Sequence, residues 1–215
     1  MKLITLYDNQ AREKFKAGWG FSCLLKLEEQ TILFDTGADV ETLAYNARLL
    51  EIDKDKISHC FISHDHYDHT GGIGWLSPKT KVVFPNQYKG EISQIDAMVF
   101  DLPIKEQTVI VKPNKVMLVG CSHPGIVRMA NAVYEKYGKL KLIIGGFHLL
   151  GKSEREVSEM AKVLLEKTEL IAPCHCTGES AIKVFEEVFG KRFIENYAGK
   201  IIEIQPLSLK GEGTF

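Results

Sequence analysis

The chain has 215 residues, 45% of them hydrophobic, and a formal net charge of −1. This length and composition suffice for one sizeable core and predict a single domain over residues 1–215. The balanced, interspersed charges argue against a nucleic acid or an anionic membrane surface as a partner, and no apolar stretch approaches the roughly 18 residues of a spanning helix. Five cysteines, an odd number at scattered positions, predict reduced thiols in a cytoplasmic protein.

The first half of the chain is predicted to be rich in strands. Apolar or alternating runs predict them at 1–8, 21–27, 31–34, 57–63, 81–85 and 107–111. The opening run meets a charge too soon for a signal peptide. Residues 39–50 predict a helix, because their apolar side chains recur on one stripe. Residues 86–106 show no regular pattern and are predicted to be irregular.

Helices are predicted to cover the second half. One begins near Pro124, a second at the capping box formed by Ser153 and Glu156, and a third at Gly178, with Gly190 as its stop. Further strands are predicted at 116–122, 140–147, 170–174 and 201–204.

Three of the seven histidines, His64, His66 and His69, lie in one hexapeptide together with Asp65 and Asp68. Positions i and i+2 diverge on a helix but share one side of an extended chain, so the segment is predicted to be a strand-to-helix loop. Neutral imidazole is the commonest protein ligand for zinc and also suits iron, manganese and nickel. The hexapeptide therefore predicts a metal site.

Three other histidines, His123, His148 and His175, each follow a predicted buried strand and a few small residues. Ligands in layered α/β folds gather beyond the carboxyl ends of strands, so these loops can converge with the hexapeptide on one pocket. A single histidine at such a place is more often structural, but the joint arrangement favours a metal site. His59 falls within a strand and is predicted either to be structural or to support the ligands from behind.

These motifs resemble a known family. Residues 63–72 are similar to the HxHxDH signature of the metallo-β-lactamase superfamily, and residues 33–37 are similar to the strand and turn before it. Residues 120–126, 144–149 and 172–178 resemble a subgroup described as similar to the dihydropterin ribofuranosylaminobenzene phosphate synthase of methanopterin biosynthesis. The resemblance implies an α/β (α+β) fold, a four-layer αββα sandwich with helices outside two packed sheets.

The resemblance also implies a set of ligands and a chemistry. The matching positions are His64, His66 and His123 for a first metal and Asp68, His69 and His175 for a second. One or two divalent ions are expected, zinc foremost, with iron, manganese or nickel as alternatives. Asp68 is the candidate catalytic residue. The implied enzyme is a metallo-hydrolase in which a hydroxide held by metal attacks a small-molecule ester, lactone or phosphoester.

The sequence departs from the family after the strand predicted at 140–147. Most members with two metals carry a bridging Asp there, whereas this chain has Gly145, Gly146, Phe147 and His148. A neutral imidazole has one free lone pair and cannot bridge two ions. His148 is predicted either to ligate one metal or to orient substrate, and the number of metals stays open.

Several side chains near the motifs are expected to support the site. Asp35 is expected to cap backbone amides of its turn rather than bind metal. Cys174 and Cys176 flank His175, and Cys121 lies two residues before His123. All three are expected to point away from the face that the histidine uses, with a thiolate contribution to the metal as the alternative. Four aromatic residues either wall a pocket for a flat substrate or pack in the core: Trp19, Phe21, Tyr67 and Trp75.

Three functions from different classes stay open on the sequence. The first is a metal-dependent hydrolase acting on a small molecule. The second, implied by the resemblance, is a transferase or synthase that joins a pterin to an arylamine. The third is a non-catalytic protein that binds metal or ligand, against which the complete first-metal ligand set argues. The expected partner is a small-molecule substrate, phosphorylated or pterin-like, and the oligomeric state is left open.

Overall fold

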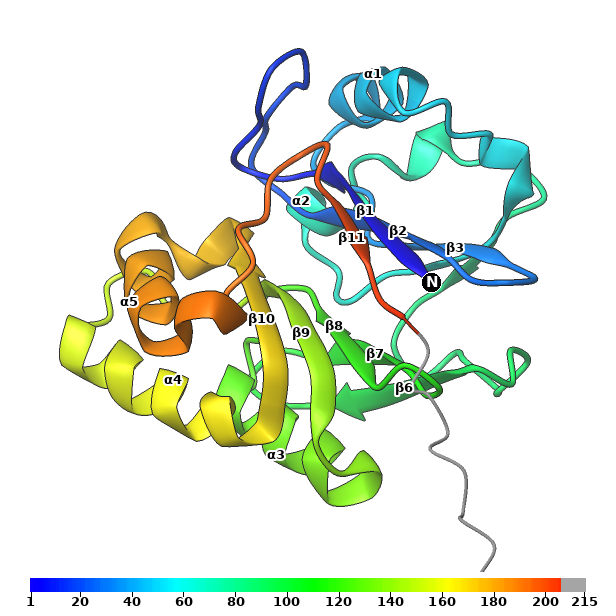
Figure 1. The fold of residues 1–215 in the computed structure, drawn as a ribbon. Helices are drawn as coiled ribbons and strands as arrows, with labels where there is room; N and C mark the ends of the chain where they lie inside the picture. Colours follow the sequence, from blue (N-terminus) through cyan, green and yellow to red (C-terminus); the bar gives the residue numbers. More distant parts are fainter. Residues whose placement is uncertain (206–215) are drawn as a thin grey trace, which may run out of the picture.

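The computed structural model describes residues 1–205. These residues form two β-sheets packed face to face, with helices on both outer sides (Figure 1). The single domain over 1–215 remains a prediction, and its segment 206–215 lies outside the described residues.

The first sheet has the strand order β11-β1-β2-β3-β4-β5. Its strands are β1 (Lys2–Tyr7), β2 (Ser22–Lys26), β3 (Thr31–Phe34), β4 (Ile57–Phe61), β5 (Lys81–Val83) and β11 (Ile201–Glu203). β3, β4 and β5 run parallel to one another, and the other neighbouring pairs are antiparallel. The carboxyl ends of β3 and β4 therefore meet at one edge.

The second sheet has the order β10-β9-β8-β7-β6. Its strands are β6 (Ile95–Phe100), β7 (Glu106–Val111), β8 (Val116–Val119), β9 (Leu140–Gly146) and β10 (Thr168–Cys174). β8, β9 and β10 are parallel, whereas β7 is antiparallel to both β6 and β8. Three carboxyl ends thus lie together in this sheet too.

The α-helices are α1 (Val40–Leu49), α2 (Tyr67–Thr70), α3 (Ile126–Tyr137), α4 (Glu154–Lys167) and α5 (Glu179–Phe189). Within residues 1–205, no helix combines the length and the apolar character that crossing a bilayer requires.

Three clusters of buried apolar side chains define the layers. The inner faces of the two sheets meet in one cluster, which joins Phe34 and Phe61 of the first sheet to Leu118 and Ile144 of the second. A second cluster lies between the second sheet and helices α3, α4 and α5, and a third lies between the first sheet and α1. The order helix, sheet, sheet, helix confirms the predicted αββα sandwich.

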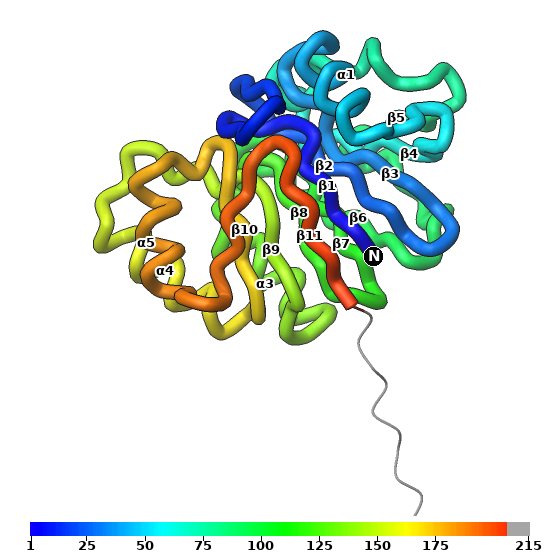
Figure 2. Tube along the Cα trace, turned by 45° about the horizontal axis from the view of Figure 1, so that its top comes forward, coloured from blue at the N-terminus to red at the C-terminus, as the bar shows by residue number. Residues whose placement is uncertain are grey.

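The first and last described strands lie side by side, as Figure 2 shows. β1 pairs with β11, with Leu3 opposite Ile202, and the amino group of Met1 donates a hydrogen bond of 3.0 Å to the Ile204 carbonyl oxygen. The first sheet is therefore completed only when the chain returns from the second.

Most predicted elements are present, but the prediction of irregular structure over 86–106 was wrong. That segment contains β6, which pairs along its length with β7. β6 is an edge strand whose four central residues are half-buried. Because neither face is fully covered, its side chains do not alternate between apolar and polar, and the usual signal of a strand is missing.

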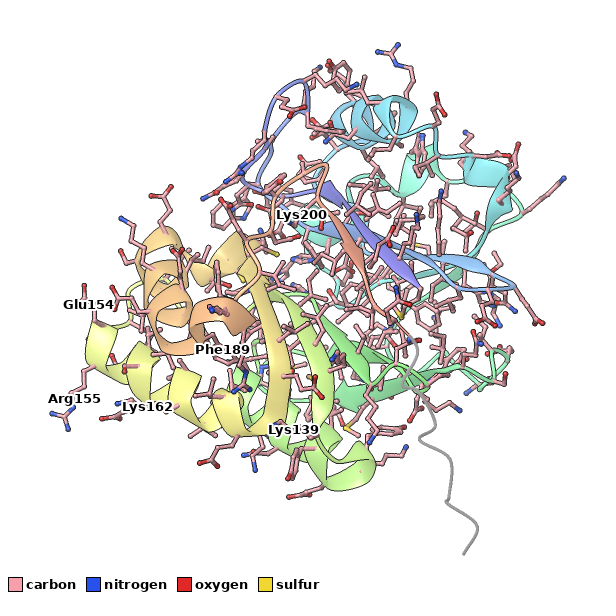
Figure 3. The ribbon with its side chains drawn as sticks, viewed as in Figure 1. Lys139, Glu154, Arg155, Lys162, Phe189 and Lys200 are labelled. Atoms are coloured by element: carbon pink, nitrogen blue, oxygen red, sulfur yellow. The ribbon has the colours of Figure 1, made fainter. Side chains whose placement is uncertain are left out.

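The predicted capping box of α4 is confirmed. The Ser153 hydroxyl accepts from the Glu156 backbone N–H, and the Glu156 carboxylate accepts from the Ser153 backbone N–H. Figure 3 shows Glu154, Arg155 and Lys162 pointing away from the sheet, whereas Val157 faces the second apolar cluster.

Replacing Ser153 by Ala should lower the free energy of unfolding by about 1 kcal/mol, because an N–H group at the helix start loses its acceptor. The fall in Tm, measured by circular dichroism, should be roughly 2–4 °C. Ser158→Ala in the middle of the same helix is the control and should leave stability unchanged or slightly raise it, since alanine is the better helix former. Equal losses in the two variants would exclude the capping role.

Candidate metal centre

The histidine-bearing loops meet at one end of the two sheets. Each follows the carboxyl end of a parallel strand: β4 leads to residues 64–69, β8 to His123, β9 to His148 and β10 to His175. Neighbouring parallel strands end at the same edge, so loops far apart in the sequence are brought together.

The potential ligand atoms converge in two groups. Those of His64, His123 and Cys121 lie within 4.8 Å of one another, as do those of Asp68, His69, His175 and Cys121. His66 lies beside the first group: its Nδ1 is 3.1 Å from His64 Nε2, and its ring centroid is 5.0 Å from that of His123. The six residues predicted as ligands therefore lie in one cluster, and metal binding by them stays a prediction.

His148 lies at the rim of this cluster. Its side chain is exposed, and its ring centroid is 4.7 Å from that of His123. A ligand nitrogen of His148 lies within 4.8 Å of the sulfurs of Cys121 and Cys176. Both predicted roles, metal ligand and substrate-orienting group, fit this place.

The site loops carry an unusual backbone. Asp35, Ser122, His148 and His175 have positive φ angles of 56°, 60°, 52° and 48°. Such left-handed conformations cost of order 1–3 kcal/mol for residues other than glycine, and they gather at functional sites where the surrounding structure imposes them.

This backbone overturns one expectation about the cysteines. Cys174 packs in the core between the sheets, as expected. Cys121 and Cys176 instead line the same cavity as His123 and His148. The alternation of side chains applies to an extended chain, but His175 is left-handed and begins a 3₁₀ turn, so Cys176 is rotated toward the site.

Three rings are held from behind through Nδ1. His69 Nδ1 donates to Asp35 Oδ2 at 2.7 Å, His123 Nδ1 donates to Glu106 Oε2 at 3.0 Å, and His175 Nδ1 donates to Asn9 Oδ1 at 2.9 Å. Protonation at Nδ1 leaves the Nε2 lone pair free to face the cluster, which is the usual arrangement for metal-binding histidines.

The Asp35 carboxylate contacts Ser63 and His69 rather than capping its own turn. Its carboxylate accepts from the backbone N–H and the hydroxyl of Ser63 at 2.6 and 2.7 Å, in addition to His69. The expectation that it binds amides rather than metal agrees with these contacts, although the amide belongs to the neighbouring strand end.

Glu106 and Asn9 were missed by the sequence analysis. Glu106 is fully buried at the start of β7, where its carboxylate accepts from the backbone N–H groups of Cys121, Ser122 and His123 at 2.7–2.9 Å. Its one sequence signal was a polar run, residues 106–108, at the start of a strand that is otherwise apolar. Asn9 follows β1 and carried no signal of its own.

Glu106→Gln should weaken metal binding about 10- to 100-fold, the usual effect of losing a group that orients a ligand. The amide nitrogen would confront N–H donors of the 121–123 turn, so His123 would lose its orientation. Isothermal titration calorimetry with zinc measures the change in affinity. Asp96→Asn, which alters a half-buried carboxylate of β6 that pairs with Lys136, is the control and should leave the affinity unchanged. If Glu106→Gln bound zinc with wild-type affinity, Glu106 would not be needed to orient His123 for metal binding.

Burial favours the neutral form of two imidazoles in the cluster. Burial, helped by neighbouring histidines, lowers the pKa of His64 to about 2 and that of His69 to about 3. Burial alone would raise the pKa of Asp68, but the nearby rings of His175 and His69 hold it below its usual value. Burial alone would lower the pKa of His175, but the neighbouring Asp68 and Cys176 raise it above its usual value. At neutral pH the cluster thus offers the ring lone pairs of His64 and His69 and a carboxylate.

This donor set fits a divalent cation. The Nε2 atom of His175 is buried and has no hydrogen-bond partner among the described residues, although Asp68 Oδ2 lies 3.2 Å away. The 3.1 Å between His64 Nε2 and His66 Nδ1 is close to the roughly 3.3 Å expected between two nitrogens of a tetrahedral zinc site. A buried polar atom without a partner costs about 1–3 kcal/mol, which a cation in the cluster would remove.

A cavity of about 490 Å³ opens onto the cluster. Trp19 and Tyr67 line it and are exposed, and the Trp19 ring also meets that of His175 edge-on. Phe21 and Trp75 instead pack in apolar clusters. Of the four aromatic residues considered as pocket walls, Trp19 and Tyr67 therefore line the cavity.

Comparisons with known proteins agree with the fold and the site. Residues 20–125 match the family model described as "Metallo-beta-lactamase superfamily". The crystal structure of Tm1679, described as a metal-dependent hydrolase of the beta-lactamase superfamily, superposes with a TM-score of 0.82 at 28% identity, covering 95% of this chain and 99% of that one.

Two proteins of Methanocaldococcus jannaschii are similar over nearly their full length. One is the uncharacterized protein MJ0448, 26% identical over 93% of this chain and 98% of its own. The other is 7,8-dihydropterin-6-methyl-4-(beta-D-ribofuranosyl)-aminobenzene-5'-phosphate synthase, also 26% identical, over 94% of this chain and 96% of its own. These findings, with the sandwich fold and the histidine loops, show similarity to the metallo-β-lactamase superfamily and distant homology to both archaeal proteins.

Proposed function

We propose that the protein is a metal-dependent hydrolase that cleaves an ester, lactone or phosphoester bond in a small molecule. The observation that carries the proposal is the convergence of five histidines and Asp68 from three loops, with the buried Nε2 of His175 left without a partner. The similarity to Tm1679, which is described as a metal-dependent hydrolase, supports it.

The residues of the cluster would have distinct roles. His64, His66 and His123 would hold one divalent cation, and Asp68, His69 and His175 would hold a second. A cation bound there would lower the pKa of a coordinated water and polarise the oxygen of the scissile group. Asp35, Glu106 and Asn9 keep the rings aimed at the cluster, and the Asp68 carboxylate can accept a proton from the attacking water.

The space around the cluster favours a substrate with an apolar part. A second cavity, of about 480 Å³, lies between α3 and α4 and shares His123 and His148 with the first. Apolar side chains such as Ile126, Phe147 and Met160 line it, and Lys152 stands at its edge. A substrate could place its reacting bond at the cluster and its apolar portion beside α4, whereas Lys152 already pairs with Glu156 at 3.1 Å.

The test is a panel of phosphodiesters, lactones and thioesters assayed with added zinc, manganese or iron. Turnover of one class that requires metal and is lost in His64→Ala would support the proposal. The control is His59→Ala, which alters the histidine that stacks on Phe61 within β4, outside the cluster. Metal-bound protein that turns over no member of the panel would speak against hydrolysis.

A transferase joining a pterin to an arylamine is the second candidate, and the full-length similarity to the dihydropterin synthase favours it. The exposed aromatic rings of Trp19 and Tyr67 at the cavity suit the stacking of a flat heterocycle. A pterin-condensation assay run beside the hydrolysis panel separates the two functions. Activity in neither assay, with metal bound, would leave a binding protein.

A further inference from the structure

Cys121 occupies the middle of the proposed metal site. Its side chain is 3% exposed, and its Sγ lies 3.2 Å from His69 Nε2. The sulfur belongs both to the group formed with His64 and His123 and to the group formed with Asp68, His69 and His175. Cys121 thus stands between the two sets of residues to which the proposed function gives one cation each.

A second observation points to a ligand at the same place. His175 Nε2 belongs to the same group as the Cys121 sulfur, and it is buried without a hydrogen-bond partner among residues 1–205. The sulfur and this nitrogen therefore face a common space in which His175 lacks a partner.

Two cations held close together need an anion between them, because their positive charges repel. A thiolate has several lone pairs and can serve two cations at once, whereas a neutral imidazole offers only one. The exposed ring of His148, at the end of β9, therefore cannot take this role.

The other buried carboxylates of the site are already engaged behind the rings. Asp35 accepts from Ser63 and His69, and Glu106 accepts from three backbone N–H groups and His123. Asp68 belongs to the second group and is absent from the first. Among the described acidic and sulfur ligands, Cys121 is the one that both groups share.

We propose that the Cys121 thiolate bridges two divalent cations in this site. The inference rests on the proposed function for the existence of the cations, and it adds a sulfur ligand to the all-nitrogen-and-oxygen set that the sequence resemblance implies. A thiolate bridge favours softer ions, zinc or iron over magnesium or calcium.

Cys176 provides a matched control a few ångströms away. Its thiol donates to the Cys121 carbonyl oxygen at 3.6 Å, and its sulfur groups with those of His148 and Cys121, but it belongs to neither proposed cation group. Cys176→Ser thus removes a neighbouring buried thiol without removing the proposed bridge.

The experiment is a cobalt titration of chelator-treated protein, followed in the near ultraviolet, where cobalt bound to thiolate gives a charge-transfer band, and by elemental analysis after desalting. Wild type should bind two cobalt ions per chain, and both the first and the second should change the band. Cys121→Ser should lose the band and retain at most one ion, whereas Cys176→Ser should keep the band and both ions.

The alternative outcomes are distinct. A band that responds to one equivalent alone would make the sulfur a terminal ligand and overturn the bridge. If Cys176→Ser lost the band and Cys121→Ser kept it, the thiolate ligand would be Cys176, and the proposal for Cys121 would be wrong. Wild type that binds cobalt without the band would refute the thiolate while sparing the proposed function, and wild type that binds no cobalt would refute both. The wild-type titration decides the matter even if Cys121→Ser does not fold.

Discussion

Replacing Asp68 by Asn is expected to weaken metal binding at the second position at least about 100-fold, which is the upper end of the effect seen when a mere orienting partner is lost. Asp68 is the carboxylate of the group that also contains His69 and His175. The neutral amide keeps the size of the side chain but removes the negative charge that offsets a divalent cation. Metal stoichiometry after desalting and the rate on the best substrate of the hydrolysis panel measure the loss.

Asp65→Asn is the matched control, because it makes the same chemical change three residues earlier in the same loop. Asp65 is exposed and belongs to neither group of converging ligand atoms. Its variant should retain wild-type metal content. If Asp68→Asn also bound the full complement of metal with unchanged affinity, the assignment of Asp68 as a ligand would fail.

Gly145→Ala is expected to lower the free energy of unfolding by about 3 kcal/mol or more. Gly145 has a φ of +131°, and an added Cβ would lie 1.9 Å from the Val119 carbonyl oxygen of the neighbouring strand. Backbone strain contributes about 1–3 kcal/mol, and forcing β8 and β9 apart contributes a similar amount. Thermal and denaturant unfolding should show a Tm lower by roughly 10 °C.

Gly90→Ala separates the two contributions. Gly90 also has a positive φ, of +84°, but an added Cβ would meet nothing within 4 Å. Its substitution should therefore cost the strain alone, about 1 kcal/mol. A Gly145→Ala protein as stable as Gly90→Ala would mean that β8 and β9 can separate at this point without loss.

The sequence was sufficient to predict the layers and the histidine loops, because these depend on local signals. Buried parallel strands appear as continuous apolar runs, and each of His123, His148 and His175 directly follows one. The capping box of α4 is likewise a pattern of two residues three apart. Such signals need no knowledge of which strands become neighbours.

The parts that the sequence could not predict depend on contacts between distant segments. Glu106 lies 17 residues before His123 and reaches it because β7 pairs with β8. Asn9 reaches His175 across 166 residues. The place of Cys121 between the two ligand groups depends on how the loop after β8 approaches the loop after β4 in the other sheet.

The backbone conformation of the site loops could not be predicted from the sequence for another reason. Left-handed conformations at Ser122, His148 and His175 are imposed by packing around the loops and are uncommon for residues other than glycine. In an extended chain, Cys176 would point away from the face that His175 uses. The left-handed backbone instead turns Cys176 toward the site, so the prediction from alternation was wrong there.

The most direct test of the central claim is zinc binding to chelator-treated wild-type protein, followed by elemental analysis and by thermal unfolding. We expect one or two tightly bound zinc ions per chain, and at a free concentration 100-fold above Kd a stabilisation of about 2.7 kcal/mol per site. His64→Ala should lose most of this effect, whereas His59→Ala should keep it. A wild-type chain that binds no zinc, manganese, iron or nickel and whose Tm none of them changes would contradict the claim that the converging histidines form a metal centre.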